Sequence, residues 1–136
     1  MKTAIRISAL ITVILVGALL GGCGADPDKT LQTVVDQFNE TTPMMVDDQT
    51  RLDSAELLEN RTMRMNYTLT SYASTDFDES MITAMEEAMK PQVLEQIRSN
   101  AGLAIFKDYS VTFEYAVRGS DDVELYVISI TPEDYT

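Results

Sequence analysis

This chain of 136 residues contains no histidine, no tryptophan and one cysteine, and only 10 basic residues stand against 22 acidic ones. Without histidine, neither a Ser-His-Asp nor a Cys-His catalytic site can form, and the commonest transition-metal ligand is missing. A single cysteine cannot form a disulfide within the chain, so packing must stabilise the fold. The missing tryptophan weakens the case for a carbohydrate-stacking site. We therefore expect no enzyme, no catalytic residue, no cofactor and no metal.

The first 23 residues have the pattern of a bacterial export signal. Lys2 and Arg6 flank the start of an apolar run from Ile7 to Leu20. This run is about 14 residues long, short against the roughly 20 that span a bilayer, and the basic start is typical of a signal peptide. The segment Leu20-Gly21-Gly22-Cys23 resembles the lipobox of bacterial lipoproteins. That resemblance implies cleavage before Cys23 and lipidation of Cys23 with diacylglycerol and an acyl chain such as palmitate.

Two other interpretations of the leader are an ordinary secretory signal with an incidental cysteine and an uncleaved membrane anchor. The lipoprotein interpretation predicts a chain anchored in the cell membrane or the outer membrane, facing the periplasm or the exterior. Gly24 stands where the inner-membrane retention signal of lipoproteins has aspartate, so the resemblance implies outer-membrane delivery in a cell with two membranes.

We expect a signal peptide over residues 1–22, a lipidated cysteine with a short tether over 23–26, and a single domain over 27–136. Lys2 and Arg6 leave with the leader, so 8 basic residues remain against 22 acidic ones, a net charge near −14. Such a surface repels nucleic acid and anionic lipid. A basic protein partner is compatible with the charge, and so is a simple role of the charge in solubility.

Hydrophobic periodicity predicts two helices and four strands after the leader. Asp26-Pro27-Asp28 has the residues of a helix start, and residues 62–71 alternate polar and apolar as a strand does. The predicted elements are a helix over 27–40, strands over 51–58 and 62–71, a helix capped by Thr75 or Asp76 that kinks or breaks at Pro91 and continues over 92–100, and strands over 109–117 and 123–130. The order is α-β-β-α-β-β. It predicts an α+β fold with two layers, a four-stranded antiparallel sheet with both helices on one face.

Four segments together resemble an uncharacterised family of small bacterial exported or membrane-tethered domains. They are residues 43–54, 66–69, 115–119 and 130–134. The resemblance implies one compact domain and no activity. Within the first segment, Arg51 and Asp53 are two residues apart, so they share one face of a strand. Together with Arg118 they are candidate partner-binding residues, or else solvated charges and a structural ion pair.

The methionines and acid pairs allow further interpretations. Met81, Met85 and Met89 recur every four residues, and Met63 and Met65 share a strand face. These side chains are predicted to fill the core; the alternatives are an adaptable apolar groove for a peptide or lipid, and Cu(I) ligation.

Three pairs of acidic residues are candidates for acid-base glycoside chemistry: Asp47-Asp48, Glu86-Glu87 and Asp121-Asp122. Residues that are neighbours in sequence do not face one catalytic site in a strand or helix, so the pairs do not favour this chemistry. Residues 76–80 have the first alternation of acidic residues of a calcium loop, but the glycine and the closing glutamate of such a loop are missing, so the segment is interpreted as a helix cap.

Three functions follow from these observations. The leading hypothesis is a membrane-anchored, non-enzymatic lipoprotein that acts as a protein-interaction module in the cell envelope. The alternative is a carrier of a lipid or hydrophobic ligand with a Met-lined apolar groove. A third hypothesis, an enzyme that uses carboxylates alone, requires a carboxyl group with a raised pKa. The oligomeric state does not follow from the sequence.

Overall fold

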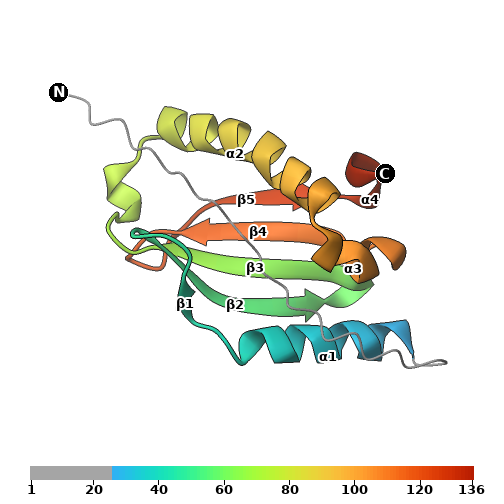
Figure 1. The fold of residues 1–136 in the computed structure, drawn as a ribbon. Helices are drawn as coiled ribbons and strands as arrows, with labels where there is room; N and C mark the ends of the chain where they lie inside the picture. Colours follow the sequence, from blue (N-terminus) through green and yellow to red (C-terminus); the bar gives the residue numbers. More distant parts are fainter. Residues whose placement is uncertain (1–25) are drawn as a thin grey trace.

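Residues 26–136, the part of the chain that the computed structural model describes, form a single sheet with helices packed against it (Figure 1). The predicted leader, Cys23 and most of the tether lie outside the described residues. The elements are α1 (Pro27–Asn39), β1 (Met44–Met45), β2 (Thr50–Leu58), η1 (Glu59–Arg61), β3 (Thr62–Leu69), η2 (Ser74–Asp76), α2 (Glu79–Ser99), η3 (Ala101–Leu103), α3 (Ala104–Asp108), β4 (Thr112–Arg118), β5 (Glu124–Ile130) and α4 (Pro132–Tyr135).

The predicted α+β class is confirmed, but the predicted four-stranded antiparallel sheet is wrong. The described residues form a five-stranded sheet in the order β1-β2-β3-β4-β5, and β3 pairs with β4 in parallel. The parallel pair arises because the chain returns through α2 and α3 to the end of the sheet where β3 began. The additional strand, β1, has two residues and pairs with β2 at its edge. Two residues are too few to show alternation in the sequence.

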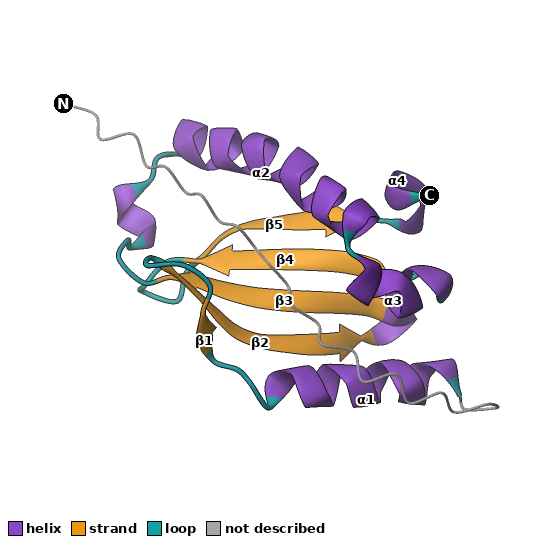
Figure 2. Ribbon diagram, in the orientation of Figure 1, coloured by secondary structure: helices purple, strands orange, loops and turns teal. Residues whose placement is uncertain are grey.

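The core lies between one face of this sheet and the helices (Figure 2). From α1, Leu31, Val35 and Phe38 are buried, and from α2, Met89, Val93 and Ile97. On the sheet the buried apolar side chains alternate, as in Met63, Met65, Tyr67 and Leu69 of β3 and Phe113, Tyr115 and Val117 of β4. All of these side chains belong to one cluster. One face of the sheet therefore supplies the core, as the strand alternation predicts.

The helix starts follow the predicted capping chemistry in α1 but not in α2. The Asp26 side chain accepts a hydrogen bond from the backbone N–H of Asp28, and Pro27 occupies the first turn of α1. The predicted caps Thr75 and Asp76 instead belong to η2. The cap of α2 is Asp78, whose side chain accepts from the backbone N–H of Met81. The Asp76 side chain instead accepts a hydrogen bond from the backbone N–H of Ala73 at the start of η2.

Of the predicted kink or break at Pro91, the break is wrong, because α2 runs without interruption from Glu79 to Ser99. Met89 and Val93, the neighbours of Pro91 on the inward face, are buried, whereas Pro91 itself is exposed. The proline removes one backbone hydrogen bond on the solvent side, where water can hydrate the freed carbonyl. Burial of the opposite face offsets that loss.

Burial separates the methionines into two groups. Met63, Met65 and Met89 are buried and belong to the core cluster, as the core interpretation predicts, and Met85 packs against it. Met81 is exposed. Because the buried side chains of this set are already in contact with core residues, they are not free to line an open groove.

Two buried tyrosines differ in how their hydroxyl groups are satisfied. The Tyr135 hydroxyl donates to the carbonyl of Val111 at 2.7 Å, whereas the Tyr67 hydroxyl has no hydrogen-bond partner among the described residues. The Tyr67 ring stacks on Tyr115, with centroids 6.1 Å apart. Burial, followed by the neighbouring Tyr115, raises the pKa of Tyr67 well above its ordinary value.

This difference predicts opposite effects for the same chemical change. Tyr67→Phe removes a buried hydroxyl without a partner and should leave the free energy of unfolding unchanged or raise it by about 1 kcal/mol. Tyr135→Phe removes one satisfied hydrogen bond and should lower that free energy by about 1 kcal/mol. Urea unfolding followed by circular dichroism measures both. A larger loss for Tyr67→Phe than for Tyr135→Phe would contradict the assignment.

Candidate partner-binding face

The second face of the sheet carries polar and charged side chains, and we call it the polar face. Its members on β2, β3 and β4 are Arg51, Asp53, Ser54, Arg64, Asn66, Thr68, Glu114 and Arg118. The buried side chains of α1 and α2 belong to the core cluster on the opposite face. Within residues 26–136, the long helices therefore cover only one side of the sheet.

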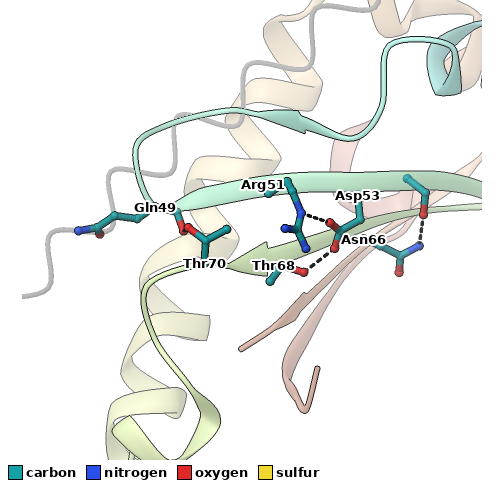
Figure 3. A network of polar contacts seen from close by, with 7 residues as sticks. Gln49, Arg51, Asp53, Asn66, Thr68 and Thr70 are labelled. Atoms are coloured by element: carbon teal, nitrogen blue, oxygen red, sulfur yellow. Dashed lines mark hydrogen bonds and ion pairs between the residues drawn. The ribbon is translucent and has the colours of Figure 1, made fainter. Parts of the chain in front are cut away.

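A β-bulge in β2 brings consecutive side chains onto the polar face. The register of β2 against β3 shifts between Leu52 and Ser54, so Asp53 is the extra residue. As Figure 3 shows, the Thr68 hydroxyl donates to one carboxylate oxygen of Asp53, and Arg51 Nε donates to the other at 2.5 Å. Asn66 Nδ2 donates to Ser54 Oγ at 3.1 Å. The bulge thus lets Asp53 and Ser54 both bind side chains of β3.

The structure brings together the three residues that the sequence selected. Arg51 and Asp53 form an ion pair, and the register places Arg51 opposite Thr68 and Thr68 opposite Arg118. Arg118 therefore lies on the same face and in the same row as Arg51, one strand beyond Thr68. Among residues 26–136, Arg118 makes no ion pair and no side-chain hydrogen bond.

Sequence reasoning missed the contribution of Thr68 and Asn66 to this face. Both are buried, although they are polar and lie outside the core. The signal was present in the alternation of β3, where Arg64, Asn66 and Thr68 occupy the polar positions. Each of these three side chains bonds a residue of a neighbouring strand, at Glu114, Ser54 and Asp53 respectively. Polar side chains at alternate positions of a central strand indicate such a network.

The end of the sheet beyond this row is closed by contacts between two loops. Asp121, in the turn between β4 and β5, accepts hydrogen bonds from the backbone N–H of Ser74 at 3.0 Å and from its hydroxyl at 2.5 Å. A side chain on Gly119 would come within 2.7 Å of the Ser74 nitrogen, so the turn approaches the loop closely enough to require glycine. The Ser74 side-chain and backbone hydrogen bonds lower the pKa of Asp121.

The Asp121 contact predicts a pH dependence with a defined sign. Because the pKa of Asp121 is lower in the folded state, its contribution to stability is present above the ordinary carboxyl pKa and is lost as the pH falls through the folded value. Ser74→Ala should return the pKa of Asp121 towards its ordinary value. NMR titration of the carboxyl carbons measures this shift. Asp134 is the matched control, since Thr131 lowers its pKa and should still do so in the variant; an unchanged pKa of Asp121 would contradict the contact.

The opposite end of the domain holds a shallow hollow at the start of α1. It has a volume of about 530 Å³ and is lined by Asp28 and by residues 57–61 around the β2–β3 turn. Arg61 crosses it, with Nε 2.9 Å from Asp28 Oδ1 and its guanidinium 6.0 Å from the Tyr109 ring centroid. The hollow is thus bridged by side chains of the chain itself.

The described residues were compared with the requirements of a metal site and of a membrane span. In residues 26–136, no three carboxylate, cysteine or histidine side chains are grouped to hold a metal ion. Hydrogen bonds from Ser74 and Thr131 lower the pKa of Asp121 and of Asp134, respectively. No helix of this part of the chain is long and apolar enough to cross a membrane.

Comparison with known proteins identifies the fold and the family. One similar structure is a protein of Pseudomonas aeruginosa predicted to be secreted, with a TM-score of 0.64 and 12% identity over 83% of this chain and 100% of that chain. Another is the pilotin EpsS of the Vibrio vulnificus type 2 secretion system, with a TM-score of 0.61 and 8% identity over 81% of this chain and 92% of that chain. At these identities the likeness shows a shared fold. No curated protein matches the sequence. The model of a domain of unknown function (DUF8479) matches residues 27–126, and the chain therefore belongs to that family.

Proposed function

We propose that this protein is a lipid-anchored, non-enzymatic adaptor that binds another protein of the cell envelope. The observation that carries the proposal is the polar face. Its arginines lie on neighbouring strands, and Arg51 and Arg64 are paired with carboxylates, whereas Arg118 has no such partner among residues 26–136. The helices complete the core on the opposite face of the sheet. The protein has the same fold as a pilotin, which is a component of a secretion system, and this likeness supports a partner in the envelope. The lowered carboxyl pKa values do not favour the enzyme hypothesis.

The anchor in this proposal is Cys23. Because α1 begins at Pro27, the chain between Cys23 and Asp26 reaches about 10 Å at most when extended. The domain would then sit directly on its bilayer, with the start of α1 towards the lipid. Its net charge near −14 is repelled by anionic lipid, so the acyl chains, at about 0.8 kcal/mol per buried methylene, must hold it there.

A crosslinking experiment in intact cells tests the adaptor function. The full-length chain with a C-terminal tag is crosslinked in the envelope, solubilised and captured, and the captured proteins are identified by mass spectrometry. We expect one envelope protein enriched well above an equally abundant tagged lipoprotein of unrelated fold. Recovery of the same background from both chains would contradict the adaptor function.

The carrier hypothesis has less support than the adaptor. Three of its five proposed lining side chains, Met63, Met65 and Met89, are buried in the core cluster. Native mass spectrometry of the protein purified from membranes distinguishes the two functions. A carrier would retain a lipid or another apolar ligand, and we expect none beyond the attached acyl chains.

A further inference from the structure

The strand β5 forms one edge of the sheet, and its outer side is unpaired within the part of the chain that the structure describes. The sheet ends at β1 on one side and at β5 on the other. β1 has two residues, whereas β5 has seven. Within residues 26–136, no hydrogen bond joins the backbone of β5 to a segment other than β4. An edge strand has a row of backbone N–H and C=O groups that faces away from its sheet, so β5 offers such a row.

The sequence of β5 has little of the protection that edge strands usually carry. Lysine, proline, bulges and short length are common devices that keep an edge strand from pairing with another chain. β5 has neither lysine nor proline, and residues 125–130 carry no charge. Its one charged residue, Glu124, and the bulge in its pairing with β4 both lie at the start of the strand. An extended segment can therefore pair with most of the length of β5.

The helix that covers β5 leaves apolar side chains partly open. Figure 1 shows α2 running alongside β5, which is the strand that α2 approaches most closely. The buried side chains of α2 begin only at Met89. In the first half of the helix, Ile82 and Met85 are half-buried and Met81 is 37% exposed. This half of α2 has apolar surface that the described residues do not cover.

We propose that β5 binds an extended segment of a partner protein, which pairs with its open edge and adds a strand to the sheet. The inference rests on the proposed adaptor function and assigns the edge at which the partner is bound. Backbone hydrogen bonds to β5 would hold the segment. Side chains on one face of the added strand would lie beneath the first half of α2, and those on the other face would continue the polar face beyond Val127. The segment is therefore apolar at alternate positions.

The charge beside β5 favours a basic residue in this segment. Burial, followed by the carboxylate of Glu86, raises the pKa of Tyr126 to about 12, so Glu86 lies near the edge strand. Glu86 makes no ion pair within residues 26–136. Glu124 already lies opposite Arg118 in the register of β4 with β5. Glu86 is thus the carboxylate that a lysine or arginine of the segment can bind.

Helix spacing and chemistry exclude two other occupants. If β5 of a second copy paired here in antiparallel fashion, the two strands would lie about 4.8 Å apart and each would carry its own α2 on the same face. Packed helices need about 8–10 Å between their axes, so the two α2 helices would collide. A lipid has no row of amide and carbonyl groups with which to pair with a strand. An extended segment without a covering helix avoids both problems.

Photo-crosslinking of the full-length chain in cells tests the inference. A photoreactive phenylalanine analogue replaces Met81 in one variant and Ser129 in another, and replaces Gln32 on α1 or Glu56 on β2 in control variants; all four residues are exposed. We expect the same protein adduct from both edge positions and none from the controls. The crosslinked peptide of the partner should alternate apolar and polar residues and contain a basic one.

Lysine substitutions then block the edge itself. With the analogue at position 81, Val127→Lys combined with Ser129→Lys should lower the yield of the adduct at least about tenfold. Gln32→Lys combined with Thr33→Lys makes the same change in net charge away from the edge and should leave the yield unchanged. Circular dichroism checks that each variant is folded; if the double variant at the edge is not, Ser129→Lys alone decides, with an expected loss of about threefold.

The proposed role of Glu86 has a neighbouring control. Glu86→Lys should lower the yield of the adduct about threefold, whereas Glu87→Lys, the same charge change one residue further along α2, should leave it unchanged. Equal yields from the two variants would contradict the contact of the segment with Glu86.

Amide hydrogen exchange measures the strand pairing directly. In the free chain, alternate amides of β5 face solvent and should exchange fast. A synthetic peptide with the sequence of the crosslinked segment should slow these amides at least about tenfold. Binding of the peptide without slower exchange in β5 would overturn the inference.

The outcomes separate this inference from the adaptor function. A protein adduct that forms only from the control positions overturns binding at the edge and leaves the adaptor function standing, as does a partner that is captured but gives no adduct at the edge. An adduct of the edge positions with lipid or with a second copy also overturns the inference. The absence of any protein adduct at all four positions, together with an empty capture experiment, overturns both.

Discussion

Replacement of Phe113 with alanine is expected to lower the free energy of unfolding by about 3–5 kcal/mol. Phe113 is 1% exposed, and its ring meets the edges of Phe106 and Tyr135 at centroid distances of 6.0 and 5.8 Å. The substitution removes buried apolar surface, two aromatic contacts and the packing between β4 and the helices at its end. Against a typical total of about 5–15 kcal/mol, such a loss approaches unfolding of the domain.

Urea unfolding followed by circular dichroism measures the effect. Phe113→Leu keeps most of the volume and should cost less than half as much, and Val123→Ala changes an exposed apolar side chain and should stay within about 0.5 kcal/mol. A loss below about 1 kcal/mol for Phe113→Ala would show that this cluster is not the centre of the core.

Cys23→Ala is expected to move the protein from the membrane fraction to the soluble fraction while the domain stays folded. In our proposal the acyl chains on Cys23 supply the attachment, and the acidic surface adds no attraction to the bilayer. The substitution lies outside residues 27–126, the span of the family domain, so we expect the unfolding curve to be unchanged.

Cell fractionation with a carbonate wash, followed by immunoblotting, measures the distribution. Gly24→Ala, which leaves Leu20 to Cys23 intact, is the matched control and should remain in the membrane fraction. If Cys23→Ala also remains there, an uncleaved leader or another surface is the anchor. A lower mobility of the variant in gel electrophoresis, relative to the wild type, would identify the uncleaved leader.

Local sequence patterns predicted those parts of the fold that local interactions determine. The alternation over residues 62–69 predicted β3 and its inward face, and Asp26-Pro27 predicted the start of α1. The parallel pairing of β3 with β4 was not predicted, because it depends on where a crossover of more than forty residues returns to the sheet. The continuity of α2 through Pro91 depends likewise on burial of Met89 and Val93, which is a tertiary effect.

The candidate site shows the same division between local and tertiary information. The spacing of Arg51 and Asp53 placed them on one strand face, and their ion pair agrees with that expectation. Arg118 is 67 residues beyond Arg51 in the sequence, and only the register of β3 with β4 places it in the same row. The bulge at Asp53, which turns its carboxylate towards Thr68, has no glycine or proline to mark it in the sequence.

The proposed attachment of the adaptor to the envelope depends on one claim, that the mature chain begins with a lipidated Cys23. The most direct measurement is mass spectrometry of the N-terminal peptide of the protein purified from membranes. The account predicts a peptide that starts at Cys23 and carries the mass of a diacylglyceryl group with or without an additional acyl chain. A peptide that starts at Met1, or an unmodified Cys23, would contradict it.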